Sequence, residues 1–168
     1  HIKQIYHGGV LYPDARHTRN PKKILLKLFD FFLKEGGHFE KQNVQTISFT
    51  SENKPVVKTE SNFYTFNKLV VACGAFSKRL TDQVDEEIPL DTERGYHVHF
   101  KGHDHLLSRP VIFLNRGFGI TPMEQGLRVV GTVEFGGLKN PLNNKRIMNL
   151  VNSAKYLFPE LGKHEDEW

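Results

Sequence analysis

The sequence has 168 residues, 38% hydrophobic and 25% charged, and its 23 Lys and Arg against 19 Asp and Glu give a formal net charge of +4. No stretch approaches the roughly 18–20 consecutive apolar residues of a membrane-spanning helix. The single cysteine, Cys73, excludes a disulfide framework and a structural thiolate zinc site. A basic module that binds anions or nucleic acid is compatible with the net charge, but the basic residues are scattered, so we predict no nucleic-acid partner.

The first helix is predicted directly after Asn20. Asn20 is a favourable N-cap, Pro21 suits the first helical position, and Gly36 can end the helix in the left-handed conformation. Apolar residues recur between them at helical spacing and predict a broad buried face. They are Ile24, Leu25, Leu28, Phe29 and Phe32.

Short strands separated by turn residues are predicted next, over residues 44–49, 56–59 and 62–66. Residues 69–73 (LVVAC) differ because their apolar run is continuous, which predicts a strand buried on both faces, as in a parallel sheet.

A short helix is predicted after Gly74, because Phe76, Leu80 and Val84 lie four residues apart. A strand, a glycine and a helix in this order can aim backbone N–H groups at an anion. A buried parallel strand that turns into a helix also needs a glycine for structural reasons alone. The local pattern therefore leaves both interpretations open.

The second half predicts an antiparallel sheet with a covering helix. Its alternating or short apolar segments are residues 96–100, 111–114, 117–121, 127–130 and 132–135. A second amphipathic helix, closed by Pro159, follows from the spacing of Ile147, Leu150, Val151, Ala154 and Leu157. The predicted fold class is mixed α/β (α+β), with part of a parallel-sheet domain beside an antiparallel sheet and its helix.

Four histidines suggest a metal site, since His97 and His99 share one face of a strand, and His103 and His105 follow. However, residues 102–105 have the composition of a surface turn, and no carboxylate motif completes a known site. We predict no metal.

Four stretches together resemble one family. They are YPDARHTRNP at 12–21, LVVACGAFS at 69–77, IPLDTERGYHV at 88–98 and TPMEQGLRVVGTVEF at 121–135. In this order and with these element types, the chain resembles the FAD-dependent D-amino-acid oxidase and dehydrogenase superfamily, most closely its bacterial D-amino-acid dehydrogenase branch.

The resemblance implies an oxidoreductase that oxidises the C–N bond of D-amino acids, or of glycine- or sarcosine-like amines, by hydride transfer to FAD. Water then hydrolyses the imino acid to a 2-oxo acid. It implies that residues 1–87 are mostly a partial FAD-binding domain with a substrate-side N-terminal segment, and that 88–168 are the substrate-binding domain. The electron acceptor would be a quinone or oxygen. We expect a cytoplasmic protein, with peripheral contact to the inner membrane and homo-oligomers as open alternatives.

The cofactor-binding residues that the resemblance implies come from three places. The backbone of Val44 would face the adenine ring, although a plain strand valine explains that residue equally well. The small residues after the apolar run would lie against the pyrophosphate and ribityl chain; they are Ala72, Cys73, Gly74 and Ala75. Cys73 is expected to be a small buried filler. Gly95 would lie on the strand beside the isoalloxazine ring.

The substrate-side candidates are His17, Tyr96, His97, Thr132 and Glu134. Tyr96 and His97 point to opposite faces of a strand, so only one of them can face a pocket. Even-numbered residues from 128 to 134 share one face unless a bulge intervenes near Gly131, and the resemblance makes this sheet the pocket floor. Arg128 is expected to be exposed rather than catalytic.

The sequence also departs from the family. It has no G-x-G-x-x-G turn followed by an acidic residue about 20 positions later, and Trp168 resembles only the first residue of the family's closing Trp-Gly-x-Arg-Pro stretch. We therefore expect an internal fragment that lacks the flanking flavin elements and the substrate-gripping arginine, so that none of its own residues is catalytic and the missing segments are its partners. Alone it would be inactive; a non-catalytic substrate-domain fragment is the alternative.

Overall fold

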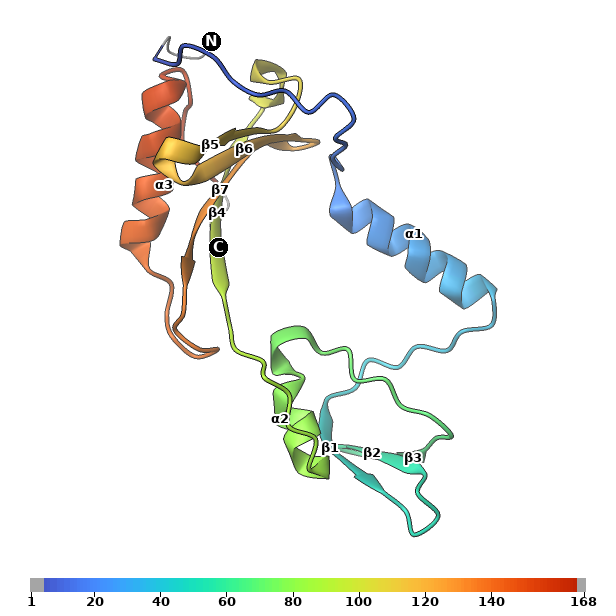
Figure 1. Cartoon of the computed structure of the whole chain (residues 1–168). Helices are drawn as coiled ribbons and strands as arrows, with labels where there is room; N and C mark the ends of the chain where they lie inside the picture. The colour runs from blue at the N-terminus through green and yellow to red at the C-terminus, as the bar shows by residue number, and fades with distance from the viewer. Residues whose placement is uncertain (1–4, 166–168) are drawn as a thin grey trace. The chain divides into compact units, whose positions relative to one another are not determined.

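The structure is a computed structural model and describes residues 5–165 (Figure 1). The chain divides into two compact units. The larger unit contains the described residues up to 31 together with those from 93 onward, and the smaller unit contains residues 32–92. The structure thus places the boundary after residue 92, whereas the sequence placed it after 87. The assignment of cofactor and substrate functions to the two parts stays a prediction.

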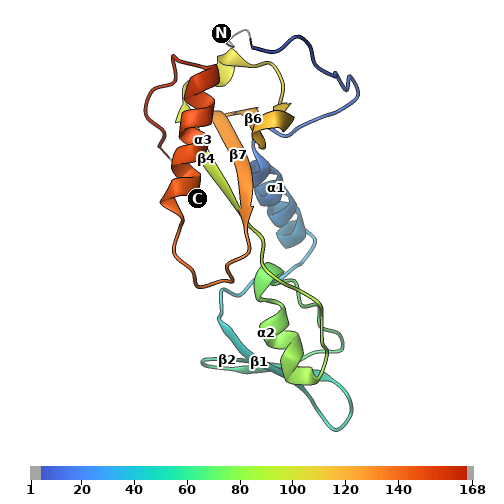
Figure 2. The same cartoon turned by 60° about the vertical axis from the view of Figure 1, so that its left-hand side comes forward.

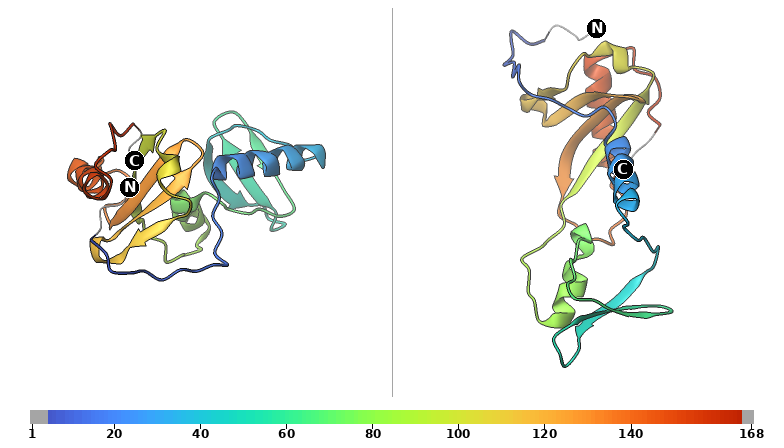
Figure 3. Two further views of the ribbon diagram at one scale, coloured as in Figure 1. Left: turned by 90° about the horizontal axis from the view of Figure 1, so that it is seen from above. Right: turned by 90° about the vertical axis from the view of Figure 1, so that its right-hand side faces the viewer.

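The larger unit is an antiparallel sheet covered on one face by a helix. Its strands are β4 (Arg94–Lys101), β5 (Val111–Phe113), β6 (Phe118–Met123) and β7 (Gly126–Glu134), in the order β4-β7-β6-β5. Short 3-10 turns, η3 (Asp104–Leu106) and η4 (Leu114–Arg116), flank β5. Helix α3 (Asn144–Leu157) runs along one side of the sheet (Figures 2 and 3).

The core of the larger unit lies between this sheet and α3. Strand β4 buries every second residue, Tyr96, Val98 and Phe100, because successive side chains of a strand face opposite sides. All five apolar positions predicted for the second helix are buried. The Asn143 side chain accepts a hydrogen bond from the Lys145 amide at 3.1 Å and so caps this helix. The predicted helix-on-sheet arrangement is confirmed.

The smaller unit is built on a three-stranded antiparallel sheet of β1 (Val44–Phe49), β2 (Pro55–Thr59) and β3 (Phe63–Thr65), in that order. The predicted short helix is one α-helical turn, α2 (Lys78–Thr81), between the 3-10 turns η1 (Gly74–Phe76) and η2 (Asp82–Val84). Its cluster of buried hydrophobic residues consists of Ile47, Val57 and Leu80.

Helix α1 (Pro21–Lys34) forms as predicted, but its buried face was wrongly predicted. The Asn20 side chain accepts a hydrogen bond from the Lys23 amide at 3.0 Å, and Gly36 ends the helix with φ +88°. No residue of α1 is buried. The spacing of the apolar residues shows which face of a helix is apolar. Burial of that face also needs another part of the protein to cover it.

The predicted buried strand at residues 69–73 is also wrong. This segment is neither helix nor strand, and Val70 is 84% exposed. A strand buried on both faces needs neighbouring strands, and within residues 5–165 no strand pairs with it. Both sheets of the described chain are antiparallel, so the mixed α+β class is confirmed without the parallel element.

Within residues 5–165, no helix has the length and apolar character to cross a bilayer. Trp168, on which the expected C-terminal resemblance rests, lies outside the described residues.

Candidate functional site

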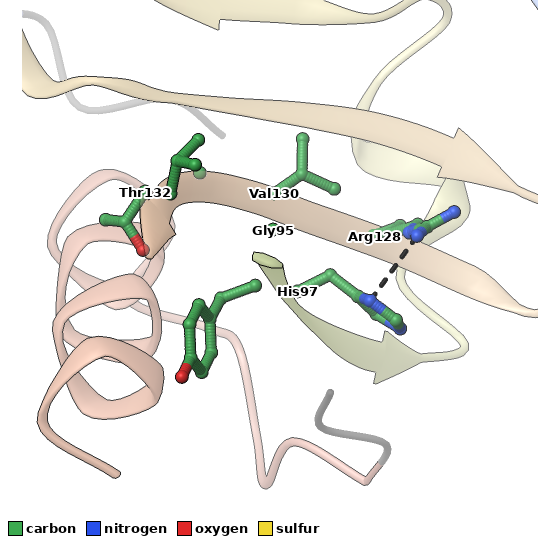
Figure 4. Close-up of a pocket in the computed structure, with 8 residues that line it drawn as sticks. Gly95, His97, Arg128, Val130 and Thr132 are labelled. Carbon is green, nitrogen blue, oxygen red and sulfur yellow. Dashed lines mark hydrogen bonds between the residues drawn. The ribbon is translucent and has the colours of Figure 1, made fainter. Parts of the chain in front are cut away.

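A cleft of about 330 Å³ opens on the sheet of the larger unit, between β4 and β7 (Figure 4). Four of its residues are predicted site residues: Gly95, Tyr96, His97 and Thr132. The others are Arg128, Val130, Gly131 and Val133. The structure thus brings together residues predicted separately for the cofactor and for the substrate.

A β-bulge at Thr132 shapes this cleft. Gly95 pairs with Val133 and Tyr96 pairs with Gly131, so Thr132 is an extra residue without a partner across the ladder. Its φ is +60°, a left-handed conformation that is strained for a β-branched residue. The two other non-glycine residues with positive φ in the described chain are Asn53 and Asp85, types that tolerate it.

The neighbouring glycine makes the bulge possible. A Cβ on Gly131 would lie 2.7 Å from the Gly117 carbonyl oxygen and 2.8 Å from the Phe118 Cβ, so only glycine fits between β7 and β6. The Thr132 Oγ1 is buried and has no hydrogen-bond partner within residues 5–165. A buried hydroxyl without a partner is costly, which marks it as a position where a ligand atom can bind.

The other end of the cleft is basic. Arg128 Nη2 lies 3.3 Å from His97 Nδ1, as the dashed line in Figure 4 shows. Arg128 Nε is buried and has no hydrogen-bond partner in the described part of the chain. Arg128 is therefore half-buried in the cleft, whereas the sequence predicted an exposed side chain. Its place beside His97 follows from the β4–β7 register, which the residue pattern alone does not reveal.

The bulge also turns Glu134 away from the cleft. After the bulge, Glu134 pairs with Arg94, and Arg94 lies on the same face of the sheet as Tyr96. The Glu134 carboxylate therefore accepts a hydrogen bond from the Tyr96 hydroxyl at 2.5 Å. The bulge considered near Gly131 is thus present, and residues 128 to 134 do not share one face, because the extra residue reverses the alternation after it. The prediction that Glu134 lines the pocket is wrong. The hydrogen bond from Tyr96 is the largest cause that lowers the pKa of Glu134 below its ordinary value, and Arg146 and Arg94 add to it.

Tyr96 and His97 point to opposite faces of β4, as predicted, although both contribute to the lining of the cleft. The Tyr96 side chain is buried, and its hydroxyl bonds to Glu134 and accepts from the Asn143 amide at 3.0 Å. Although Tyr96 contributes to the cleft wall, its hydroxyl is engaged at the start of α3. His97 presents its ring on the Arg128 side.

His17 does not line the cleft and is exposed in the segment before α1. Glu124, in the turn between β6 and β7, ties that segment to the sheet. It contacts the Asn20 side chain at 2.5 Å and pairs with Lys23, and its amide donates to the Arg19 carbonyl at 3.0 Å.

The remaining cofactor candidates lie in the smaller unit. Val44 is half-buried at the start of β1, and its carbonyl oxygen lies 3.4 Å from Arg79 Nη2. Ala72, Cys73, Gly74 and Ala75 are all exposed, so Cys73 is not the buried filler that was predicted. With only one α-helical turn after Gly74, the predicted anion-directing helix start is not formed.

No group of three or more His, Cys, Asp or Glu side chains within residues 5–165 is placed to hold a metal ion. His97 and His99 lie side by side, with ring centroids 5.3 Å apart. His103 and His105 belong to the turn around η3.

Comparisons with known proteins agree on one family. The model of the family DAO, FAD dependent oxidoreductase, matches residues 2–168. The chain is 30% identical over 158 residues to a D-amino-acid oxidase of Bradyrhizobium diazoefficiens, covering 94% of this chain and 38% of the relative. It is 26% identical over 157 residues to a D-amino acid dehydrogenase of Neisseria gonorrhoeae, covering 92% and 38%.

The fold is similar to that of glycine oxidase from Geobacillus kaustophilus, with a TM-score of 0.63 at 22% identity, covering 77% of this chain and 35% of that one. The chain thus spans well under half the length of the curated relatives it matches.

Proposed function

This chain belongs to the DAO family of FAD dependent oxidoreductases, and on that premise we propose that the whole protein oxidises the C–N bond of a D-amino acid or a small related amine. The names of the relatives supply the substrate class. The strained bulge supports it most directly, since within residues 5–165 it leaves the buried Thr132 hydroxyl, near Gly95, without a hydrogen-bond partner.

The exposed glycines of the chain fit a flat cofactor. At Gly74, φ is +54° and no atom lies within 4 Å of the position that a Cβ would take. Gly95 likewise has open space where a side chain would be. Bare backbone of this kind lets a ring or a phosphate approach closely. Residues 72–75 would hold the phosphate and ribityl portion, and Gly95 would lie beside the ring.

FAD, when bound, supplies the acceptor for the hydride that leaves the substrate Cα. The residues of this chain have the simpler tasks of binding and orientation. Val130 and Gly131 give the cleft a small apolar lining, and Thr132 lines it at the bulge. A Ser–His–Asp or paired-carboxylate arrangement is not needed for such chemistry.

The proposal also covers the electron acceptor of the enzyme and its location in the cell. Either oxygen or a quinone takes up the electrons, and parallel assays of oxygen consumption and dye reduction distinguish them. We place the protein in the cytoplasm, with peripheral contact to the inner membrane as the alternative. The exposed thiol of Cys73 is compatible with a reducing compartment.

The test is carried out on the whole protein that contains this chain. The expected result is a flavin absorption spectrum that D-amino acids bleach under anaerobic conditions. A preparation that folds but neither retains FAD nor reacts with any D-amino acid or small amine would contradict the proposal.

The cofactor placement has its own variant. We expect Gly74→Val to lower FAD occupancy at least about tenfold while the circular dichroism spectrum is kept, because a branched side chain blocks close approach. Gly102→Val is the matched control, since Gly102 also has positive φ (+70°) and open space, so both variants carry the same backbone strain. Equal FAD loss in both variants would reject the placement at residues 72–75.

A further inference from the structure

The charge of the cleft indicates the chemistry of its ligand. Arg128 and His97 are its basic residues, and no Asp or Glu lines it within the described part of the chain. The nearest acidic residue along β7, Glu134, is turned by the bulge toward Tyr96. Among the described residues, a ligand at the Arg128 end therefore meets a positive side chain and no acidic lining residue.

Arg128 still has a buried hydrogen-bond donor to satisfy. Its Nη2 makes a long contact of 3.3 Å with His97, whereas Nε is buried without a hydrogen-bond partner in residues 5–165. A buried guanidinium N–H that stays unpaired costs free energy. A carboxylate is the group that best matches adjacent guanidinium donors, because both are planar and oppositely charged.

The cleft has two distinct ends. Figure 4 shows Arg128 and His97 at one end and Thr132 at the other, with Val130 and Gly95 between them. Along the regular part of β7, Arg128 lies two residues before Val130, about 6.6 Å at ~3.3 Å per residue, and the bulge follows. The α-carboxylate and α-amino groups of an amino acid share one carbon and cannot reach both ends. A ligand that uses both must carry a second polar group on an extended body.

We infer that Arg128 is a specificity-determining residue that binds a carboxylate in the side chain of the substrate. The inference rests on the proposed function: the reacting Cα lies near Gly95 and Thr132, and the substrate side chain follows Val130 to Arg128. The substrate class is then acidic D-amino acids, with D-glutamate as the probe. Arg128 touches the far end of the substrate and takes no part in the bond changes.

The experiment compares D-glutamate with D-methionine, which has a neutral side chain of similar length, as substrates of the FAD-loaded whole protein. The wild type is expected to prefer D-glutamate. In Arg128→Leu, kcat/KM for D-glutamate should fall roughly 10- to 100-fold, mostly through KM, because one charge-assisted contact is lost. The value for D-methionine should change less than about threefold. Arg109→Leu, at an exposed arginine outside the cleft, is the matched control and should leave both unchanged.

A binding measurement separates this inference from the proposed function. Titration calorimetry of glutarate and of butyrate into the whole protein needs no turnover. Glutarate should bind the wild type more tightly than butyrate does. The two acids should bind Arg128→Leu equally weakly. This preference would support the Arg128 site even if no amino acid were oxidised. Equal binding of the two acids by wild type, or equal loss of D-glutamate and D-methionine turnover in Arg128→Leu, would overturn it.

Discussion

The two units of the chain differ in how much core they have. In the larger unit, fifteen buried apolar residues between one sheet and α3 form a single cluster. The corresponding cluster of the smaller unit has three buried residues, Ile47, Val57 and Leu80, beneath a three-stranded sheet and one helical turn. A sheet of this size needs a well-covered apolar face to be stable alone. The cleft therefore lies on the better-packed unit, and the exposed glycine segment 72–75 lies on the weaker one.

The largest expected effect tests this contrast with one substitution in each unit. Ile120→Ala removes a fully buried side chain of the larger unit and should lower the free energy of unfolding by about 3–5 kcal/mol. Ile47→Ala removes a 6% exposed side chain of the smaller unit and should cost about 2 kcal/mol, because fewer buried neighbours surround it. Chemical denaturation of the whole protein measures both. An equal or larger cost for Ile47→Ala would break the comparison.

A second pair compares two tyrosine hydroxyls bonded to carboxylates. Tyr96→Phe in the larger unit leaves the Asn143 amide at the start of α3 without its acceptor and should cost about 1–3 kcal/mol. Tyr64→Phe in the smaller unit removes an exposed hydroxyl contact with Glu40 and should lower the stability much less than Tyr96→Phe does. Thermal unfolding of the two variants side by side is the measurement. A similar midpoint for both would show that the α3 start does not depend on Tyr96.

The pH dependence sharpens the same contrast. The Tyr96 hydrogen bond lowers the pKa of Glu134, so the ionised carboxylate stabilises the folded state above its ordinary pKa near 4.5. This contribution is lost as pH falls below the ordinary pKa of a glutamate and through the lowered pKa of Glu134. Tyr96→Phe removes the main cause of the shift. The stability difference between wild type and Tyr96→Phe should therefore shrink on acidification; a constant or growing difference would contradict this account.

The smallest effect concerns the segment before α1. The lowered pKa of Glu124 follows first from its contact with Lys23 and then from Asn20. Because these groups are exposed, Glu124→Gln should leave the thermal midpoint nearly unchanged. The substitution should accelerate amide hydrogen exchange around residues 12–20, because this segment loses its contacts with the β6–β7 turn. Lys54→Gln is the control for loss of an exposed ion pair, here with Glu52 in the smaller unit. Unchanged exchange in Glu124→Gln would show that the tie does not order the segment.

The two long helices show what the sequence can predict. In α3 all five apolar positions are buried as expected, whereas in α1 an equally regular pattern forms a helix with no buried residue. Capping by Asn20 and Gly36 is local and follows from residue type. Coverage of a face depends on other segments. For the same reason the continuous apolar run at 69–73 predicted a strand that has no partner in the described chain.

The cleft was predictable only in part. Gly95, His97 and Thr132 were selected by resemblance, and the structure places them on one cleft. The exact position of the bulge was not predictable. Gly131 lies close to the backbone of Gly117 and Phe118, but the residue that has no partner in the ladder is Thr132. That single residue decides which face Glu134 occupies. Arg128 was missed because its burial depends on the register of β4 and β7, which pairs it with His99 and brings it diagonally to His97.

A crystal structure of the FAD-loaded whole protein would test the central claim most directly, namely that the bulge at Thr132 shapes the ligand site of a flavoenzyme. The predicted result is a flavin ring beside Gly95, a positive φ at Thr132 with its hydroxyl hydrogen-bonded to a ligand, and Glu134 still bonded to Tyr96. A flavin bound elsewhere, with the Gly95–Thr132 face covered by protein, would contradict the account.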